Sequence, residues 1–381
     1  MERADVLIVG GGPAGSSCAE ALVSAGRDVL VLDRAAFPRD KPCAGWITPD
    51  VVSALRLDLD AYGRDHTLQA VSRFRTGRIG GRATDVDYGA RVSYGIRRCE
   101  FDAYLLRRSG ARTRFGESVA DVRRDGRDWV VNGRFAARVL VGAGGHFCPV
   151  ARALNGPPPR PATVVAREVE FLLEGDTLAA CRVEGDRPEL YFCPDLRGYG
   201  WCFRKGSHLN VGFGRVDEHA LPSRVKAFVD WLVGGGRIAR PPEGAWRGHA
   251  YVVRESQPRR VAGEGVLLAG DAAGLAFPAS GEGILPAVAS GQLAAEAILH
   301  EEDDARRESR YREGLDRVLG RPAAIHPLLR PLAVRAAGLL LASPAFRRRV
   351  VLDRWFLHRS SAERPAAEMV ARPADRRPSP D

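Results

Sequence analysis

The sequence predicts an α/β protein with a Rossmann-type domain, an inserted antiparallel β-sheet domain and a C-terminal helical segment. The first observation is an apolar run near the amino terminus that leads directly into a glycine-rich turn. The second is a later apolar run, residues 266–269, that also ends in glycines. Between them, residues 162–215 contain several short runs of the β-branched and aromatic residues that favour strands.

The glycine-rich turn at residues 10–15 reads Gly-Gly-Gly-Pro-Ala-Gly and follows the apolar residues 6–9. Gly10 permits the turn, Gly12 lets the backbone approach a pyrophosphate, and Gly15 lets the next helix pack on the strand. The first N–H groups of that helix have no partner within it and favour an anion. We therefore expect a dinucleotide site here, with a plain glycine turn as the alternative.

An acidic residue follows the second apolar run of this unit. Residues 29–32 are apolar, and Asp33 comes about 20 residues after the glycine turn. An acid in that place binds the ribose hydroxyls of a dinucleotide. Asp33 could instead cap a helix, since aspartate is a good N-cap residue. Its position after a strand favours the ribose interpretation.

Composition limits the class of protein. The chain has 381 residues, of which 45% are hydrophobic, which is typical of a globular protein with a core. No apolar run approaches the roughly 18 residues of a membrane span. The 7 cysteines are scattered without a Cys-x-x-Cys pair, which favours a reducing, cytoplasmic location. No His or Cys cluster has metal-ligand spacing, so we expect no metal site.

The chain is basic, with a formal net charge of +10 and mostly arginine among its 57 basic residues. A solvated basic surface is the simplest interpretation. Attraction to anionic lipid headgroups or to a phosphorylated substrate is the second. No nucleic-acid-binding module is recognisable, so we expect no nucleic-acid partner.

Further elements follow in order along the chain. A Pro-rich loop spans residues 37–45, and a short helix follows Pro49. Residues 68–96 alternate like antiparallel strands, and a helix opens near Arg98. Asn132 and Gly133 predict a hairpin turn. Later we expect strands at 138–142, 164–165, 169–172, 189–192, 209–213 and 266–269, and helices around 228–232 and 283–298.

Three prolines at 157–159 mark a crossing between domains. We expect a discontinuous dinucleotide-binding domain of residues 1–67, 97–156 and 255–302, a substrate domain of residues 68–96 and 157–254, C-terminal helices over 303–359, and a disordered tail over 360–381.

A second motif carries further chemistry. Residues 269–274 read Ala-Gly-Asp-Ala-Ala-Gly, so Asp271 ends an apolar strand and can accept a hydrogen bond from a sugar-alcohol hydroxyl. Residues 281–283, Gly-Glu-Gly, precede a helix and can place N–H groups against the pyrimidine edge of a flavin. Together with the first turn and Asp33, this resembles the FAD site of glutathione-reductase-type flavoproteins, specifically the para-hydroxybenzoate-hydroxylase-like branch. Arg98 resembles that branch's arginine, which helps to hold the cofactor.

Within that branch, three stretches resemble the geranylgeranyl reductase family. They are residues 41–45 (Lys-Pro-Cys-Ala-Gly), residues 198–206 with the strand after them, and residues 278–284. The resemblance covers roughly residues 1–300. It implies FAD contacts from Gly10, Gly12, Pro13, Ala14, Gly15, Asp33, Arg34, Cys43, Ala44, Arg98, Val119, Gly144, Gly270, Asp271, Pro278, Gly281, Gly283 and Ile284, and substrate contacts from Trp46, Trp201 and Phe203.

The implied function is an FAD-dependent reduction of carbon–carbon double bonds in an apolar substrate, either an isoprenoid or another natural product. Arg204 stands where the family usually has proline, and Gly144 where the branch often has aspartate. An FAD-dependent monooxygenase and an electron-transfer flavoprotein are the alternatives. No second nucleotide-binding domain is recognisable, so NAD(P)H or a reduced electron-carrier protein is the expected donor.

Cys43 is the candidate catalytic residue. It lies in the stiff loop after the ribose-binding strand, from which a thiol could donate a proton to the substrate. A small buried apolar role is the alternative, and it is the favoured interpretation for Cys148. We expect no chemical role for His146.

The segment 321–357 combines leucines with arginines and predicts amphipathic helices. Packing against the FAD domain is the favoured interpretation, and contact with a membrane surface is the alternative. The residues concerned are Leu328, Leu329, Leu332, Leu339, Leu340 and Leu341, with Arg330, Arg335, Arg347, Arg348 and Arg349.

Overall fold

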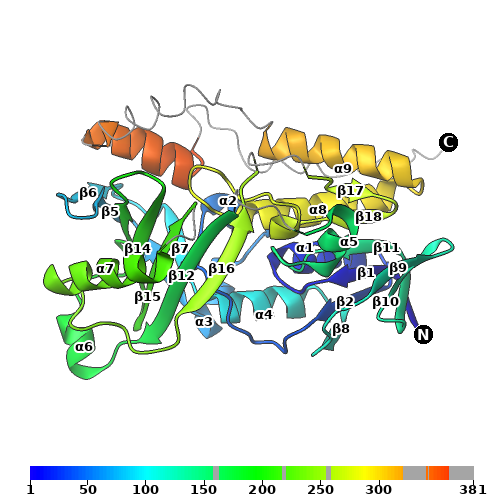
Figure 1. The fold of residues 1–381 in the computed structure, drawn as a ribbon, viewed down its shortest axis with the longest axis horizontal. Coiled ribbons are helices and arrows are strands. Elements are labelled where there is room, and N and C mark those ends of the chain that lie inside the picture. Colours follow the sequence, from blue (N-terminus) through cyan, green and yellow to red (C-terminus); the bar gives the residue numbers. More distant parts are fainter. Residues whose placement is uncertain (158–162, 217–219, 255–258, 321–339, 342, 360–381) are drawn as a thin grey trace, which may run out of the picture.

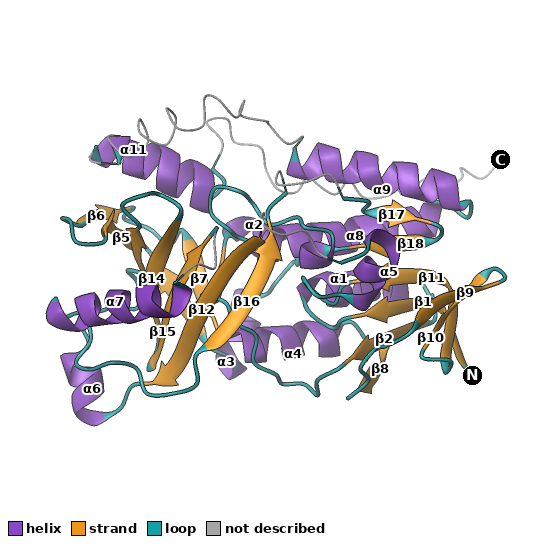
Figure 2. Ribbon diagram, viewed as in Figure 1, coloured by secondary structure: helices purple, strands orange, loops and turns teal. Residues whose placement is uncertain are grey.

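The computed structural model describes residues 1–157, 163–216, 220–254, 259–320, 340–341 and 343–359. Two large sheets lie side by side in it, each with its own helices (Figures 1 and 2). The proline run at 157–159 and the tail after residue 359 fall partly or wholly outside the described residues, as do four of the six leucines of the C-terminal segment.

The first sheet has eight strands, and its parallel centre consists of apolar runs. Residues 6–9, 29–32 and 139–141 are almost fully buried, as expected for strands covered on both faces. The order is β17-β18-β11-β1-β2-β8, with β10 and β9 continuing from β11. The bounds are β1 (Glu2–Val9), β2 (Val29–Asp33), β8 (Arg112–Phe115), β9 (Val122–Asp125), β10 (Asp128–Val131), β11 (Phe135–Gly142), β17 (Ala262–Gly263) and β18 (Val266–Leu268).

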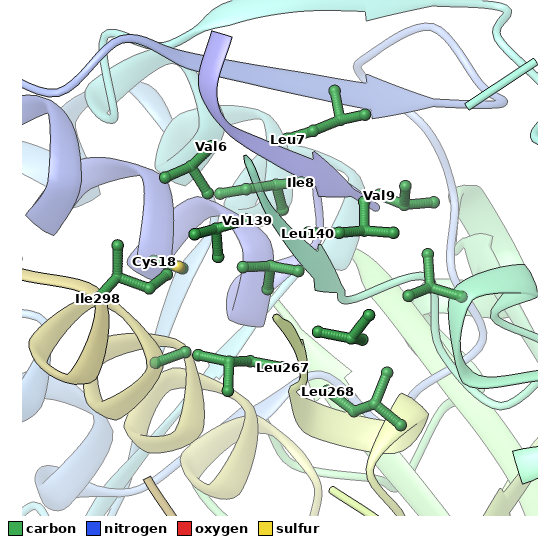
Figure 3. Close-up of a cluster of buried hydrophobic side chains, with 14 of the residues drawn as sticks. Val6, Leu7, Ile8, Val9, Cys18, Val139, Leu140, Leu267, Leu268 and Ile298 are labelled. Carbon is green, nitrogen blue, oxygen red and sulfur yellow. The ribbon is translucent and has the colours of Figure 1, made fainter. Parts of the chain in front are cut away.

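Helices cover this sheet and close its core. In Figure 3, Leu140 of β11 and Leu267 of β18 lie in one cluster with Cys18 and Ile298, which come from two helices packed on the sheet. A Cβ at Gly291 would lie 2.1 Å from the carbonyl oxygen of Ala14, so only glycine permits this close approach of the two helices. The helices are α1 (Pro13–Ser24), α4 (Arg98–Arg108), α5 (Pro149–Asn155), α8 (Ile284–His300) and α9 (Asp304–Leu319).

The second sheet has seven strands, antiparallel except for one parallel pair, β13 with β5. Helix α7 (Leu221–Gly234) packs on it through Phe228, whose ring takes the space that a Cβ at Gly200 would need. Helix α6 (Gly175–Ala180) lies at its end (Figure 1). The order is β16 (Arg247–Val252), β12 (Thr163–Leu172), β15 (His208–Arg215), β14 (Gly198–Lys205), β13 (Glu189–Phe192), β5 (Arg73–Arg78) and β6 (Thr84–Asp87).

Two details of this region differ from expectation. The runs at 164–165 and 169–172 form one strand, β12, because its backbone pairs with β15 on one side and β16 on the other, whatever its side chains. The strands of 68–96 are divided between two sheets. A separate three-stranded sheet combines β4 (Leu68–Val71) and β7 (Ser93–Ile96) with β3 (Trp46–Ile47). Short helices α2 (Pro49–Ala54) and α3 (Leu59–Asp65) follow β3.

The described part of the C-terminal segment packs on the second sheet, which corrects the expected packing against the FAD domain. It comprises α11 (Pro344–Phe346) and a π-helix, η3 (Arg347–Phe356), drawn in orange in Figure 1. Leu352 and Phe356 join the cluster around Phe74, because the apolar face of η3 matches that sheet. Arg347 is buried and donates to the carbonyl oxygen of Thr76 at 3.1 Å, so it is no part of an exposed basic face.

The helices of the described ranges are all too short or too polar to cross a bilayer.

Candidate functional site

A cavity of about 690 Å³ lies between the two large sheets. On one side it is lined by the carboxyl ends of β1, β2 and β11, the place where open parallel sheets bind ligands. On the other side it is lined by residues of β12, β14 and β16. The loop of residues 34–46 forms a third wall.

The glycine turn forms the first wall with backbone groups. Gly10 has a φ of +109°, and a Cβ there would lie 2.4 Å from the carbonyl oxygen of Ala143. A Cβ at Gly15 would lie 1.9 Å from the carbonyl oxygen of Gly10, so helix and strand touch through bare backbone. Gly12 is the N-cap of α1, and no side chain caps it. The first N–H groups of α1 are therefore available to an anion such as a pyrophosphate.

Asp33 is nearly buried at the end of β2 and holds the turn in shape. Its carboxylate accepts hydrogen bonds from the backbone N–H groups of Gly11 at 2.8 Å and Ala35 at 2.9 Å. The guanidinium of Arg39 lies 3.9 Å from the same carboxylate. Asp33 thus presents a fixed acceptor at the cavity edge, as binding to a ribose requires.

Arg98 is buried at the start of α4 and is fixed by Asp102, one helical turn later. Two parallel hydrogen bonds of 2.8 Å join them. Burial lowers the pKa of Arg98, but the Asp102 carboxylate and the Cys43 thiol outweigh it and raise the pKa above the usual value. Arg98 therefore brings a permanent positive charge and a hydrogen bond to the loop that carries Cys43.

The loop of residues 34–46 is also held from the second sheet. Asn210 of β15 donates to the carbonyl oxygen of Cys43 at 3.1 Å, and Lys205 of β14 donates to that of Ala44 at 3.1 Å. Gly45 has a φ of +69°, and a Cβ there would collide with the carbonyl oxygen of Ile96 at 2.1 Å. The half-buried Cys43 is thus positioned by both halves of the molecule.

Asp271 follows β18 and lies in a cluster with two residues of other elements. His249 of β16 is 3.0 Å from its carboxylate, and Lys41 is 3.8 Å away. Burial raises the pKa of Asp271, but the His249 hydrogen bond and the Lys41 charge hold it well below its usual range. Burial and Lys41 lower the pKa of His249, so its imidazole is neutral near neutral pH. The sequence did not predict a role for His249, because a single histidine in a strand belongs to no motif with a recognisable spacing.

The start of α8 contributes a second uncapped helix N-terminus. Gly283 is its N-cap without a side-chain hydrogen bond, and a Cβ there would lie 3.2 Å from Oδ1 of Asp271. One carboxylate oxygen of Glu282 pairs with His358, whereas the other is buried without a partner among the described residues. Nδ1 of His146, also in the lining, is buried and unpaired within the same ranges. Such unsatisfied groups and open N–H ends fit a polar ligand that completes them.

An aromatic group lines the end of the cavity nearest the second sheet. The rings of Trp46 and Phe356 are stacked with their centroids 5.4 Å apart. The ring of Tyr199 lies edge-on to Phe356, with a centroid distance of 5.7 Å. Trp201 also lines this end. Phe203 lies behind Trp46 at 5.7 Å. Phe356 was not foreseen, because its role depends on where the C-terminal segment packs.

Beside these rings lies a buried polar network that sequence reasoning missed. Asn210 donates to Oε2 of Glu168 at 2.6 Å and accepts from Nε1 of Trp201 at 2.7 Å. Glu170 pairs with the fully buried Lys205 and with Arg97. Arg97 directly follows β7, whereas the other residues lie on β12, β14 and β15. Because these segments are far apart in the chain, no local sequence pattern indicates the network.

Most of the predicted site residues meet at this one cavity. Three do not line it: Gly15 lies behind the turn, Phe203 lies behind Trp46, and Pro278 lies outside. Cys148 is fully buried, and burial raises the pKa of its thiol. The predicted site residues that line the cavity are Gly10, Gly12, Pro13, Ala14, Asp33, Arg34, Cys43, Ala44, Trp46, Arg98, Val119, Gly144, Trp201, Gly270, Asp271, Gly281, Gly283 and Ile284.

Comparison with known proteins gives matches over most of the chain. A family model described as FAD binding domain matches residues 3–169. The menaquinone reductase of Mycobacterium tuberculosis is 32% identical over 324 residues, covering 78% of this chain and 77% of that protein. The geranylgeranyl diphosphate reductase of Rhodobacter capsulatus is 30% identical over 323 residues, covering 77% and 75%. A geranylgeranyl bacteriochlorophyll reductase-like structure from Thermoplasma acidophilum aligns over 90% of this chain and 88% of its own, with a TM-score of 0.71 and 21% identity.

The cavity geometry and these matches agree on the cofactor. Two uncapped helix N-termini, a ribose-side acid and close backbone contacts at Gly10 suit a dinucleotide, and FAD is the dinucleotide of the matched domain. The expected α/β fold and FAD-dependent oxidoreductase class are confirmed. The chain belongs to the geranylgeranyl reductase family of FAD-dependent oxidoreductases.

Proposed function

We propose that this protein reduces carbon–carbon double bonds of an isoprenoid substrate with electrons carried by its FAD. The observation that supports this most directly is the aromatic end of the cavity, formed by Trp46, Tyr199, Trp201 and Phe356. Aromatic walls suit an apolar chain with few polar groups. Menaquinone and geranylgeranyl diphosphate, named for the relatives, both carry such chains.

Different parts of the cavity lining are proposed to bind different parts of FAD. Gly12 and the start of α1 bind the pyrophosphate, Asp33 the adjoining ribose, and Arg98 and Asp271 the middle of the cofactor. The start of α8 at Gly283 faces the pyrimidine edge. Bound FAD supplies the hydride chemistry. The other predicted lining residues are proposed cofactor contacts on the same grounds, and the predicted domain boundaries remain a proposal.

Cys43 is proposed to act on turnover rather than on cofactor binding. Its loop is fixed by Asn210 and Lys205 at the aromatic end of the cavity. A thiol there could donate a proton to the substrate or shape the pocket by its size. Comparing Cys43→Ser with Cys43→Ala separates these roles: proton donation survives only in the serine variant, whereas equal loss points to the sulfur itself.

The electron donor and the cellular site are also proposals. NAD(P)H or a reduced carrier protein is the expected donor, and the cytoplasm the expected compartment. A peripheral membrane contact would suit an apolar substrate, and it depends on a segment in which four of the six leucines lie outside the described residues. Flotation with anionic liposomes at low salt tests it, and absence of protein from the lipid fraction rules it out.

The proposed reaction is tested by anaerobic single turnover. The FAD-loaded protein is reduced chemically and mixed with geranylgeranyl diphosphate or with a short-chain menaquinone. The proposal expects flavin reoxidation without oxygen and a product with two more hydrogens. Reoxidation only when oxygen is admitted, with an oxygenated product, would identify a monooxygenase instead. Reoxidation by a carrier protein alone would identify an electron-transfer flavoprotein.

A further inference from the structure

Glu168 lies on the face of β12 that borders the cavity. Ala166 and Glu168 both line it, since alternate residues of a strand share one face. Glu168 pairs in register with Gly212 of β15, which has no side chain, and the Trp201 ring occupies the space above that glycine. The carboxyl of Glu168 is therefore placed next to the aromatic end of the cavity and is only 5% exposed.

Glu168 and Glu170 lie two residues apart on one strand but have different partners. Glu170 holds both cations, Lys205 and Arg97. Within the described residues, Glu168 makes no ion pair and receives one hydrogen bond through Oε2, from the neutral amide of Asn210. A buried carboxyl without a cation favours its protonated form.

The charged surroundings of Glu168 agree with this. Burial and the negative charge of Glu170 raise its pKa to about 7. Hydrogen bonding from Asn210 and the positive charges of Lys205 on β14 and Arg247 on β16 oppose the rise without cancelling it. At neutral pH a large fraction of Glu168 therefore carries a proton, as a general acid must.

We propose that Glu168 is the general acid of this cavity and donates the proton that completes reduction of the substrate double bond. This rests on the proposed function. The O–H bond of Glu168 breaks, and a C–H bond forms at one carbon of the double bond. The other carbon receives a hydride, with two electrons, from the reduced cofactor, which is thereby oxidised. The resulting Glu168 carboxylate is protonated again from solvent before the next turnover.

The network around Glu168 suits this cycle. Asn210 hydrogen-bonds to both the Glu168 carboxyl and the carbonyl oxygen of Cys43, so it sets the acid and the loop in one frame. When Glu168 becomes a carboxylate, the amide of Asn210 remains a donor to it. Glu170 is paired with Lys205 and Arg97 and stays ionised throughout. These two cations lower its pKa against the opposing effect of burial.

The test compares wild type with Glu168→Gln, Glu168→Asp and Cys43→Ser, all loaded with FAD. In anaerobic single turnover with geranylgeranyl diphosphate or a short-chain menaquinone, the wild-type reoxidation rate should fall about tenfold per pH unit above about pH 7. Glu168→Gln should react at least about 100-fold more slowly and lose this pH dependence. Glu168→Asp should retain a pH-dependent reaction. Cys43→Ser should change the rate, since Cys43 is proposed to act on turnover, but the pH midpoint of that rate should stay near 7.

A second readout is independent of turnover. Infrared difference spectra of wild type, with and without FAD, should show one buried carboxylic acid band that disappears as pH rises through about 7, and Glu168→Gln should lack it. If Glu168→Gln does not retain FAD, the test uses the wild-type protein only. Its flavin reoxidation rate should then change with pH at the same midpoint as the carboxylic acid band. A reoxidation rate that does not follow the band overturns the inference.

Failure of the inference and failure of the proposed function give different results. Wild-type reoxidation by a probe, with the same rate and pH profile in Glu168→Gln, overturns the role of Glu168 and leaves the reductase function standing. Loss of the pH dependence in Cys43→Ser instead assigns the proton to the thiol. Wild-type flavin that neither probe reoxidises contradicts the reductase function, and the inference falls with it.

Discussion

The two walls of the cavity are built on opposite principles. The wall at β1 and α1 consists of backbone groups, brought together because Gly10 and Gly15 have no side chains that would collide. The wall at β12, β14 and β16 consists of side chains, supported by a network in which Asn210 of β15 holds Glu168 and Lys205 of β14 pairs with Glu170. A wall made of backbone groups can be predicted from the sequence, because it requires glycines at a fixed spacing. A side-chain wall depends on register between strands, and Glu168 and Asn210 are 42 positions apart.

The largest expected effect concerns the buried cation of the side-chain wall. Lys205 is 1% exposed and pairs with Glu170. Lys205→Met leaves that carboxylate with only Arg97, and removing one partner of a buried pair costs about 3–5 kcal/mol. Urea unfolding measures this loss.

Lys226 provides the matched control. It pairs with Asp230 at 2.7 Å, but its side chain is 76% exposed. Lys226→Met should change the free energy of unfolding by less than about 1 kcal/mol. Equal effects at the two lysines would contradict the view that the network stabilises this wall.

The next effect concerns the pH dependence of stability. The folded pKa of Glu168, about 7, exceeds its ordinary value of 4.5. The native state therefore binds more protons than the unfolded state between these values, and stability contributed by the protonated group is lost as pH rises through about 7. Relative to Glu168→Gln, wild type should lose about 3 kcal/mol of unfolding free energy across this window. Parallel stability curves for the two proteins would show that Glu168 titrates normally.

The backbone wall is tested by adding one methyl group. Gly15→Ala places a Cβ 1.9 Å from the carbonyl oxygen of Gly10, so strand and helix must separate. We expect a loss near the upper end of the roughly 1–3 kcal/mol typical of overpacking, together with loss of bound FAD. Gly234→Ala, where no atom lies within 4 Å of the new Cβ, should be neutral or slightly stabilising. Retention of FAD by Gly15→Ala would refute the close-contact argument.

The smallest effect is expected where both walls meet, at Asp271. Asp271→Ala removes a charged acceptor worth roughly 1.5–3 kcal/mol to a hydrogen-bonded hydroxyl. The dissociation constant of FAD, measured by flavin fluorescence, should rise about tenfold or more. His249→Gln removes the neighbouring imidazole but keeps the carboxylate, and should change FAD affinity less. A larger effect at His249 would mean that the imidazole binds the cofactor directly.

The same contrast explains what the sequence could predict. The strand at residues 6–9, its turn and helix α1 follow from an apolar run and glycines. The hairpin turn is confirmed, with φ of +52° at Asn132 and +65° at Gly133. The three-stranded sheet around β3 was not predicted, because two-residue strands carry no periodicity. His249 and Glu168 were missed because burial and neighbours, rather than local pattern, set their chemistry. The roles proposed for the cavity residues remain predictions.

The position of Phe356 has a consequence for how the cavity comes into being during synthesis. The ring that stacks on Trp46 belongs to nearly the last described residue of the chain, while the opposite wall begins at Val9. Translation proceeds from the amino terminus, and contacts of such long separation form slowly. The cofactor side of the cavity is complete only after β18 and α8 have been synthesised. The aromatic end also requires η3, which follows them in the chain. An emerging chain therefore acquires the means to hold FAD before it acquires the enclosure in which a substrate would be sheltered.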